Sequence, residues 1–481
     1  MRNKLNLYPD YKAEIKEIET NGVSTSLIEK IIKKHTLNAT YNRNLYERYE
    51  ALEEGVPIFS RRPRFHEKGE PEPINNRINN DFFSEIIDFE TGYFSGNPIS
   101  YSYSKTEESE DDTGGKNAID TAAKVLSDFV TRNNMFEKDM EMTKHAACYG
   151  YVGRLFYHDK EGFERVMIVP GYEAIILSKT DITEPQYAIR YYSVNDINER
   201  PVLYVEFYDD KQIKFYEGQL GALNWVEDKP NLYDFCPLQG IPKNDEKMGS
   251  AEKVLADIDA YDRTISDNSN DVESFSNAYI VYENIQADEE EIRKAQHTGA
   301  IQFNTGSAGG KVYYLTKNIN DAFTEHHLDR LEKNIYRFSK TPNLNDESFG
   351  NASGTALKFK LTALESKCGM FEAKVMSAGT YMFKLLASSW KKKGISVEPL
   401  QCIMEFKRNF PLDILGESQA AQALINTGMP KEIAWDKALS FIDDIDYVMQ
   451  MIEDEKNNIP SLVESDIEEE NGVEAEMSGG E

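Results

Sequence analysis

One stretch of the sequence resembles a phosphate-binding loop. In "TGSAGGK" (residues 305–311), Thr305 stands where a P-loop has its first glycine, and Val312 stands where Ser or Thr follows the lysine. The stretch also leads into a strand pattern rather than a helix, so no helix N-terminus would face a phosphate. We therefore interpret it as a hairpin turn and predict no cofactor.

Histidines and cysteines lack the spacing of metal ligands. His326 and His327 are adjacent in a helical pattern and point about 100° apart, so they cannot chelate one metal alone and are expected at a surface or an interface. No Ser/His/Asp, Cys/His or paired-carboxylate arrangement stands out. The sequence predicts no catalytic residue, no metal site and no enzyme. Four widely separated cysteines are expected to be buried, reduced thiols: Cys148, Cys236, Cys368 and Cys402.

Charge is distributed unevenly along the chain. With 54 Lys and Arg against 83 Asp and Glu over 481 residues, the formal net charge is −29. Such acidity argues against a protein that grips nucleic-acid phosphates over its whole surface, although it permits one past which DNA slides. Residues 355–393 nevertheless hold eight lysines against two glutamates, whereas residues 248–275 hold seven acids against two bases.

Three of these lysines form a stripe. Lys360, Lys367 and Lys374 lie seven residues apart, and Glu365 and Glu372 flank the other side of the same helical pattern. These charges can pair with those of neighbouring helices, as they do beside a coiled-coil seam. Alternatively, the lysines can contact a polyanion in a channel. The pattern leaves both interpretations open.

The elements that must position these residues begin with an α+β unit of about 240 residues. Ser24 or Thr25 caps a helical pattern that starts before Leu27, and period-two alternation typical of strands recurs from about residue 151. No apolar stretch has the length of a signal-peptide core at the N-terminus or of a membrane span elsewhere. We therefore expect a soluble, unexported protein.

From Gly249 onward, helices with narrow apolar seams dominate. Apolar residues at spacings of four and three predict helices near 249–275 and 321–340 and a longest helix over 355–393, which would span roughly 58 Å. Such a helix is expected to pack on other long helices of its own chain or of a neighbour. The seams of the first two contain Val254, Ile258, Val272, Leu328, Leu331, Ile335 and Phe338, and the longest contains Leu357, Leu361, Leu364, Cys368, Phe371, Val375, Ala378, Met382 and Leu385.

A loop of fourteen residues, Thr341–Gly354, separates the second and third helices. Its proline, glycines and asparagines exclude a helix. Loops of this length are uncommon in compact domains, and when they are ordered they usually have a function. After the longest helix come a strand pattern and a helical unit broken at residues 428–430. Residues 463–481, with eight acids and no base, are expected to be disordered.

Four stretches resemble the portal proteins of tailed bacteriophages, specifically those of siphophages of Gram-positive bacteria. They follow the family's order over about residues 74–361, and the last two are the more specific. They read "INNRINNDFFSEIIDFETGYFSGNPISY", "GYVGRLFYHDKEGFERVMIVPGYEAIILSKTDITEPQYAIRYY", "EKVLADIDAYDRTISDNSNDVESFSNAYIVYEN" and "HLDRLEKNIYRFSKTPNLNDESFGNASGTALKFKL".

The resemblance implies an α+β portal fold that forms a ring, usually of twelve subunits, at one vertex of the capsid. It implies an outward-facing wing (1–247), two stem helices (248–275 and 321–340) and a small α/β clip between them (276–320). A tunnel loop (341–354), a tunnel helix (355–393), a strand returning to the wing (394–415), a helical crown (416–460) and a disordered acidic tail (461–481) complete the expected arrangement.

In such a ring the chain would be a conduit for double-stranded DNA during packaging and ejection, in the virion and, during assembly, in the host cytoplasm. Expected partners are further copies of the chain, DNA, the terminase large subunit, major capsid and scaffolding proteins, and head-completion and tail proteins. No association with a membrane is expected. With this resemblance, the residues expected to face DNA in the loop are Asn343, Asn345, Asp346, Ser348, Asn351 and Ser353. Those expected to contact DNA or a neighbouring subunit are Lys340, Lys358, Lys360, Lys367 and Lys374. Those expected to dock partners at the clip are Glu289, Glu290, Arg293 and Lys294.

Two other classes of function stay open at this level. One is a nucleic-acid-processing enzyme with an unrecognised site in the α+β unit, which the missing motifs disfavour. The other is a coiled-coil interaction scaffold without a role in DNA transport. The mass of the assembled protein would separate a ring from either.

Overall fold

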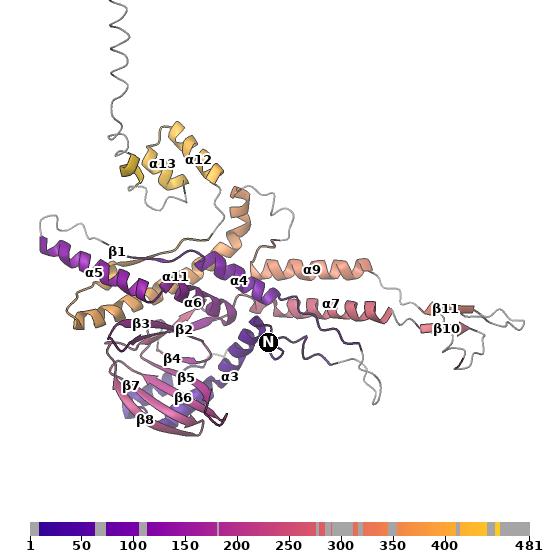
Figure 1. Cartoon of the computed structure of the whole chain (residues 1–481), viewed down its shortest axis with the longest axis horizontal. Coiled ribbons are helices and arrows are strands. Elements are labelled where there is room, and N and C mark those ends of the chain that lie inside the picture. The colour runs from indigo at the N-terminus through magenta and orange to yellow at the C-terminus, as the bar shows by residue number, and fades with distance from the viewer. Residues whose placement is uncertain are drawn as a thin grey trace, which may run out of the picture. The chain divides into compact units, whose positions relative to one another are not determined.

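The computed structural model describes residues 9–62, 74–104, 113–179, 182–275, 279–283, 290, 311–315, 321–344, 354–409, 414–439 and 448–452 (Figure 1). The chain divides into two compact units, one of residues 1–344 and 361–409 and the other of residues 345–360 and 410–481. The first unit mixes helices with antiparallel sheets, in agreement with the α+β class predicted from the sequence.

The N-terminal helices cover a five-stranded sheet. Helices α2 (Lys12–Asn21) and α3 (Thr25–Tyr49) share a core with the sheet, in which Ile28 and Ile31 lie with Ile175 and Ile189. The Ser24 side chain accepts a hydrogen bond of 3.3 Å from the Leu27 backbone, as the sequence predicts. The sheet has the order β4-β5-β6-β7-β8, with β4 (Ala174–Leu177), β5 (Tyr187–Asn195), β6 (Pro201–Tyr208), β7 (Gln212–Gln219) and β8 (Ala222–Pro230).

A second, three-stranded sheet lies next to three helices. It has the order β3-β2-β9, with β2 (Tyr151–His158), β3 (Glu164–Val169) and β9 (Leu238–Pro242). The helices are α4 (Phe82–Ser95), α5 (Thr113–Arg132) and α6 (Met135–Tyr149), of which α4 and α6 pack on each other. Strands β1 (Ser100–Tyr103) and β12 (Cys402–Glu405) pair antiparallel, although about 300 residues separate them in sequence. Within the predicted return strand, residues 402–405 form β12, and the three residues before them form a 3-10 turn, η2 (Pro399–Gln401).

Two helices, α7 (Leu255–Phe275) and α9 (Asp321–Ser339), pack side by side (Figure 1). A 3-10 turn, η1 (Glu252–Val254), precedes α7, and strands β10 (Tyr279–Glu283) and β11 (Lys311–Leu315) pair antiparallel between the two helices in sequence. The predicted seams hold only in part. Val272 of α7 is 68% exposed. Phe338 of α9 is 51% exposed, because Tyr336 and Ser339 join Ile335 on the buried face near the end of that helix.

The longest helix is α11 (Gly354–Lys392), close to the predicted bounds. Its seam prediction is confirmed wherever the side chains are described, since the eight seam residues from Leu361 to Leu385 are at most 4% exposed. The seam contacts α4 and β2 of its own chain, and Arg154 of β2 donates to the carbonyl of the seam residue Ala378 at 3.3 Å. The Phe371 ring lies 4.9 Å from that of Phe94, and the Tyr381 hydroxyl donates to the Cys236 carbonyl at 2.9 Å.

The second unit contains α12 (Ile414–Asn426) and α13 (Lys431–Ala438), which pack on each other. Gly428 adopts a left-handed φ of 91° between them, where the sequence predicts the break. None of the helices in the described part of the chain has the length and apolar composition needed to cross a membrane.

Candidate functional site

The long helix α11 is fixed to the first unit by a buried ion pair. The Lys367 ammonium lies 2.7 Å from Glu90 Oε2 and donates to the carbonyl oxygen of Ser339, the last residue of α9, at 3.1 Å. Burial lowers the pKa of Lys367, while Glu90 opposes that shift. Lys367, which the sequence assigns to contacts with DNA or with a neighbouring subunit, thus has its ammonium group enclosed by partners of its own chain.

Glu90 is the centre of this cluster and is completely buried. Its Oε1 pairs with the ammonium of Lys243, the residue after β9, and its Oε2 also accepts from the Ser250 hydroxyl at 2.6 Å. Burial alone raises the pKa of a carboxyl, but the two ammonium groups outweigh it and hold the pKa of Glu90 at about 2. Glu90 had a sequence signal: it falls on the apolar face of α4, four residues from Ile86 and from Phe94.

The other charged side chains near the middle of α11 also pair within the chain. Arg408 binds Glu365 through two contacts of 3.0 Å and Glu372 through one of 2.5 Å. Lys374 lies 2.7 Å from Asp245, whose side chain is 83% exposed. Of the two interpretations of the lysine and glutamate stripes, pairing with neighbouring elements therefore holds for Lys367 and Lys374, with partners on α4 and the β9–α7 connection.

The positions of α11 that are exposed between residues 362 and 380 carry no charged side chain. Nine residues between positions 362 and 380 are exposed: Thr362, Ala363, Ser366, Gly369, Met370, Ala373, Met376, Ser377 and Thr380. The hydroxyls of Ser366 and Thr380 donate to carbonyls four residues earlier in the same helix, at 3.0 and 3.2 Å. This face therefore presents small and apolar groups and no cation.

The predicted loop and clip residues are described only in part. The Asn343 side-chain amide donates to Glu332 of α9 at 2.8 Å. Lys340 is exposed with a left-handed φ of 63°, and Lys360 and Glu290 are also exposed. The remaining predicted positions lie outside the described side chains: Asn345, Asp346, Ser348, Asn351, Ser353, Lys358, Glu289, Arg293 and Lys294.

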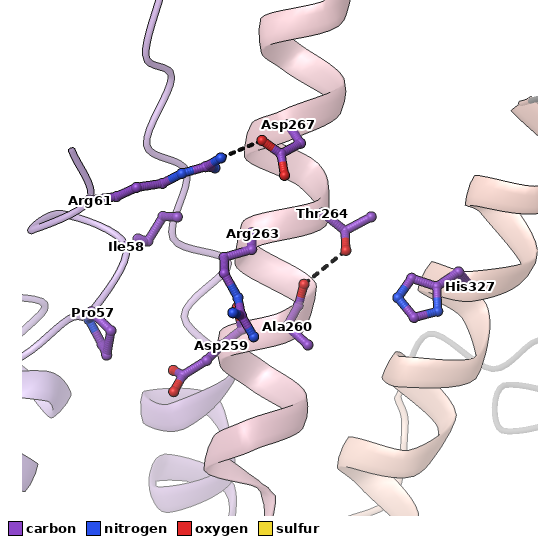
Figure 2. A pocket seen from close by; sticks show the side chains of 9 residues that line it. All are labelled: Pro57, Ile58, Arg61, Asp259, Ala260, Arg263, Thr264, Asp267 and His327. Atoms are coloured by element: carbon purple, nitrogen blue, oxygen red, sulfur yellow. Dashed lines mark hydrogen bonds and ion pairs between the residues drawn. The ribbon is translucent and has the colours of Figure 1, made fainter. Parts of the chain in front are cut away.

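The acidic helix α7 borders a cleft of about 640 Å³ (Figure 2). In Figure 2, Arg61 from the segment after α3 pairs with Asp267 of α7, and His327 of α9 lies on the other side of α7. Asp259, which also lines the cleft, pairs with Arg48 of α3 at 2.6 Å. The predicted acidity of this helix is thus partly neutralised by the N-terminal region. His327 is exposed, as expected from the sequence.

One arrangement that the sequence did not reveal brings a serine, a histidine and a carboxylate together. Ser389 Oγ lies 2.9 Å from His158 Nε2 and donates to Glu164 Oε1 at 2.6 Å. The carboxylate thus accepts the hydrogen bond of the serine hydroxyl itself. In a catalytic triad it would instead accept from the far nitrogen of the histidine and orient the ring. Ser389 is also 2% exposed. We interpret the trio as a structural link between α11 and the three-stranded sheet. Among the described residues, no group of three or more His, Cys, Asp or Glu side chains could hold a metal ion.

Comparisons with known proteins agree with the resemblance seen in the sequence. A family model described as "Phage portal protein, SPP1 Gp6-like" matches residues 28–461. The portal protein of Bacillus phage SPP1 is 24% identical over 83% of this chain and 80% of its own length. The portal protein of Clostridium phage phiCD119 is 24% identical over 71% of this chain and 76% of its own length.

A solved structure, "Neck of empty GTA particle computed with C6 symmetry", aligns with a TM-score of 0.41 at 10% identity, over 76% of this chain and 88% of the other. The family model covers far more than half of the chain and confirms the family suggested by the four sequence stretches. This chain belongs to the phage portal protein family, in its SPP1 Gp6-like branch.

Proposed function

We propose that the chain is the subunit of a ring at one vertex of a phage capsid, and that the ring conducts double-stranded DNA during packaging and ejection. The observation that carries this proposal is the family match over residues 28–461, which includes both the sheets and the long helices. The two relatives, each 24% identical, are named portal proteins.

The parts of the chain take the following roles in this proposal. The body of sheets and helices around α4 and α6 is the wing, and α7 with α9 is the stem. The segment that contains β10 and β11 is the clip, which docks the terminase and later the head-completion proteins through Glu289, Glu290, Arg293 and Lys294. Helices α12 and α13 belong to the crown.

The charge distribution of α11 supports a conduit that does not hold DNA tightly. A protein that neutralises phosphates binds DNA with an affinity that depends steeply on salt. On α11, Lys367 and Lys374 are engaged by Glu90 and Asp245, and the exposed face between them carries no cation. A channel wall built from such a face offers the phosphate backbone few binding wells.

The uncharged residues between α9 and α11 are the proposed DNA-facing positions. Asn343, Asn345, Ser348, Asn351 and Ser353 offer amide and hydroxyl groups, which contact a duplex without the strong attraction of lysine or arginine. Lys340, Lys358 and Lys360 are proposed as sparse basic contacts with DNA or with a neighbouring subunit.

Native mass spectrometry of the purified chain tests the ring. Twelve copies of 55.0 kDa give a particle of about 0.66 MDa. A monomer or a dimer under all conditions, including in the presence of scaffolding protein, would contradict the proposal. The conduit is tested separately by in vitro packaging, in which capsids that contain the ring should protect DNA from nuclease and capsids that lack it should not.

A further inference from the structure

The C-terminal end of α9 is held in an uncommon way. Lys340 takes the left-handed position after the helix, with a φ of 63°, although glycine is the usual residue there. The Thr341 amide then donates to the Tyr336 carbonyl at 3.1 Å, which is the closing bond of a Schellman motif. Thr341 is 5% exposed, so the chain leaves the helix into the protein and not into solvent.

The last carbonyl of α9 finds its partner on another helix. The final carbonyls of a helix have no intrahelical donor and carry partial negative charge, so they attract cations. Here the Ser339 carbonyl accepts from the Lys367 ammonium of α11 at 3.1 Å. The same ammonium lies 2.7 Å from Glu90 of α4, so one cation connects three helices.

The burial of this cluster makes its geometry exacting. The side chain of Glu90 is 1% exposed, and the side chain of Lys367 is 14% exposed. A buried charge that loses its partner is strongly unfavourable, because water cannot replace the lost interaction. A shift of α11 by one helical turn, about 5.4 Å, would remove the ammonium from both acceptors at once. The helices can therefore change register only by breaking the whole cluster.

We infer that Lys367 is a positioning residue that couples the end of α9 to α11 through the buried carboxylate of Glu90. The coupling keeps the two helices in one register, so that a displacement of either helix reaches the other. Under the proposed function, these are the two helices that flank the tunnel loop. The coupling itself is a property of the single chain and can be measured without DNA or a ring.

The chain provides a matched control for this inference. Lys243 pairs with the other oxygen of the same carboxylate, and its side chain is 2% exposed. It contacts α11 through the face of the Phe371 ring, 4.7 Å away, whereas its own backbone amide donates to Gly150. K367M and K243M thus each remove one of two cations from Glu90, but K367M alone removes the donor to the Ser339 carbonyl.

Hydrogen–deuterium exchange of the full-length chain tests the coupling. In K367M, amides of residues 339–341, 343, 344 and 361–366 should exchange at least ten times faster than in the parent protein. In K243M they should stay within about two-fold, even if the midpoint of denaturation falls equally in both variants. Equal acceleration in both variants would reduce Lys367 to an ordinary structural residue, and no acceleration in K367M would refute the coupling.

A milder pair covers the case in which K367M does not fold. Arginine keeps the charge but places planar nitrogens where the lysine has one ammonium, so K367R should accelerate exchange in the same residues by about three-fold or more, and K243R should not. The same result in both arginine variants would overturn the inference. These outcomes are independent of the ring and packaging assays, so a failure of the coupling leaves the proposed function standing, and the reverse also holds.

Discussion

Three buried carboxyl groups of this protein have pKa values shifted in opposite directions, because their partners differ. Glu90, Asp139 and Glu164 are each at most 2% exposed. Two ammonium groups hold the pKa of Glu90 near 2, and although burial opposes it, His158, Lys393 and Ser389 hold the pKa of Glu164 well below its ordinary value. Burial instead raises the pKa of Asp139 to about 7, against the lowering effects of Arg154 and of the Tyr101 hydroxyl, which donates to it at 2.8 Å.

The state of Asp139 predicts a specific pH dependence. Its pKa in the folded protein lies above the ordinary value of 3.8, so between about pH 4 and pH 7 the folded state holds a proton that the unfolded state has released. The free energy of unfolding should therefore fall as the pH rises through this range. D139N cannot ionise at this position and should lose this decrease. The free energy of unfolding of D139N minus that of the parent should therefore increase by roughly 2 to 3 kcal/mol between pH 5 and pH 8.

Urea denaturation at the two pH values provides the measurement. D128N changes an exposed carboxyl on α5 and serves as the control that should keep the parent slope. An unchanged pH slope in D139N would show that Asp139 is ionised in the folded protein throughout this range.

At the scale of elements, the two sides of α11 have different tasks. Leu364 and its seam neighbours are buried in the first unit, whereas Met370 is 54% exposed on the uncharged face. Removing side-chain atoms from a packed core leaves a cavity, but removing them from an exposed face does not. The stability of the single chain should therefore depend on one side of the helix and be nearly indifferent to the other.

Alanine substitutions measure this difference. L364A should lower the free energy of unfolding by about 2 to 5 kcal/mol. M370A should change it by less than about 0.5 kcal/mol in the unassembled chain. Chemical denaturation of both variants under conditions that prevent assembly is the appropriate assay. A large loss in M370A would mean that this face is already covered within the chain.

The end of α9 allows a stabilising substitution. Lys340 has a β-carbon in a left-handed conformation, which is unfavourable for residues other than glycine. K340G should therefore raise the free energy of unfolding by roughly 0.5 to 1 kcal/mol. K340A, which keeps the β-carbon and loses the ammonium, should have little effect. If K340A gave the same gain as K340G, the charge and not the backbone would be responsible.

At the scale of the whole molecule, the chain carries a net charge of −29 yet encloses several of its cations. Lys243 and Lys367 form ion pairs with Glu90 inside the chain, and Arg408 pairs with Glu365 and Glu372 of α11. The acidic surface that remains is consistent with a protein that DNA must pass. The proposed function places the closest approach to DNA between α9 and α11.

Deleting residues 345–351 tests that placement. The proposal predicts that the deletion leaves the ring intact, since the seams of α9 and α11 lie outside it, but reduces packaged or retained DNA by at least ten-fold. Native mass spectrometry and nuclease protection provide the two readings. Deleting seven residues of the acidic tail, 471–477, is the length-matched control. Normal packaging without residues 345–351 would remove these residues from the conduit.

The sequence by itself determined the features that depend on neighbouring residues. The spacing of Leu361, Leu364, Cys368 and Phe371 predicted the long helix and its buried side, because helical periodicity is a local property. Ser24 predicted a helix start, and residues 428–430 predicted a break, for the same reason. The four quoted stretches were sufficient to indicate the family.

Only the tertiary structure decided which partners the charged residues have. Lys360, Lys367 and Lys374 form one stripe in sequence, yet Lys367 is buried on Glu90 and Lys374 lies on Asp245 near the surface. The pairing of β1 with β12 and the contact of Ser389 with His158 likewise join positions more than 200 residues apart. Local periodicity specifies a helix face, but the partner of a charge depends on which distant element packs on that face.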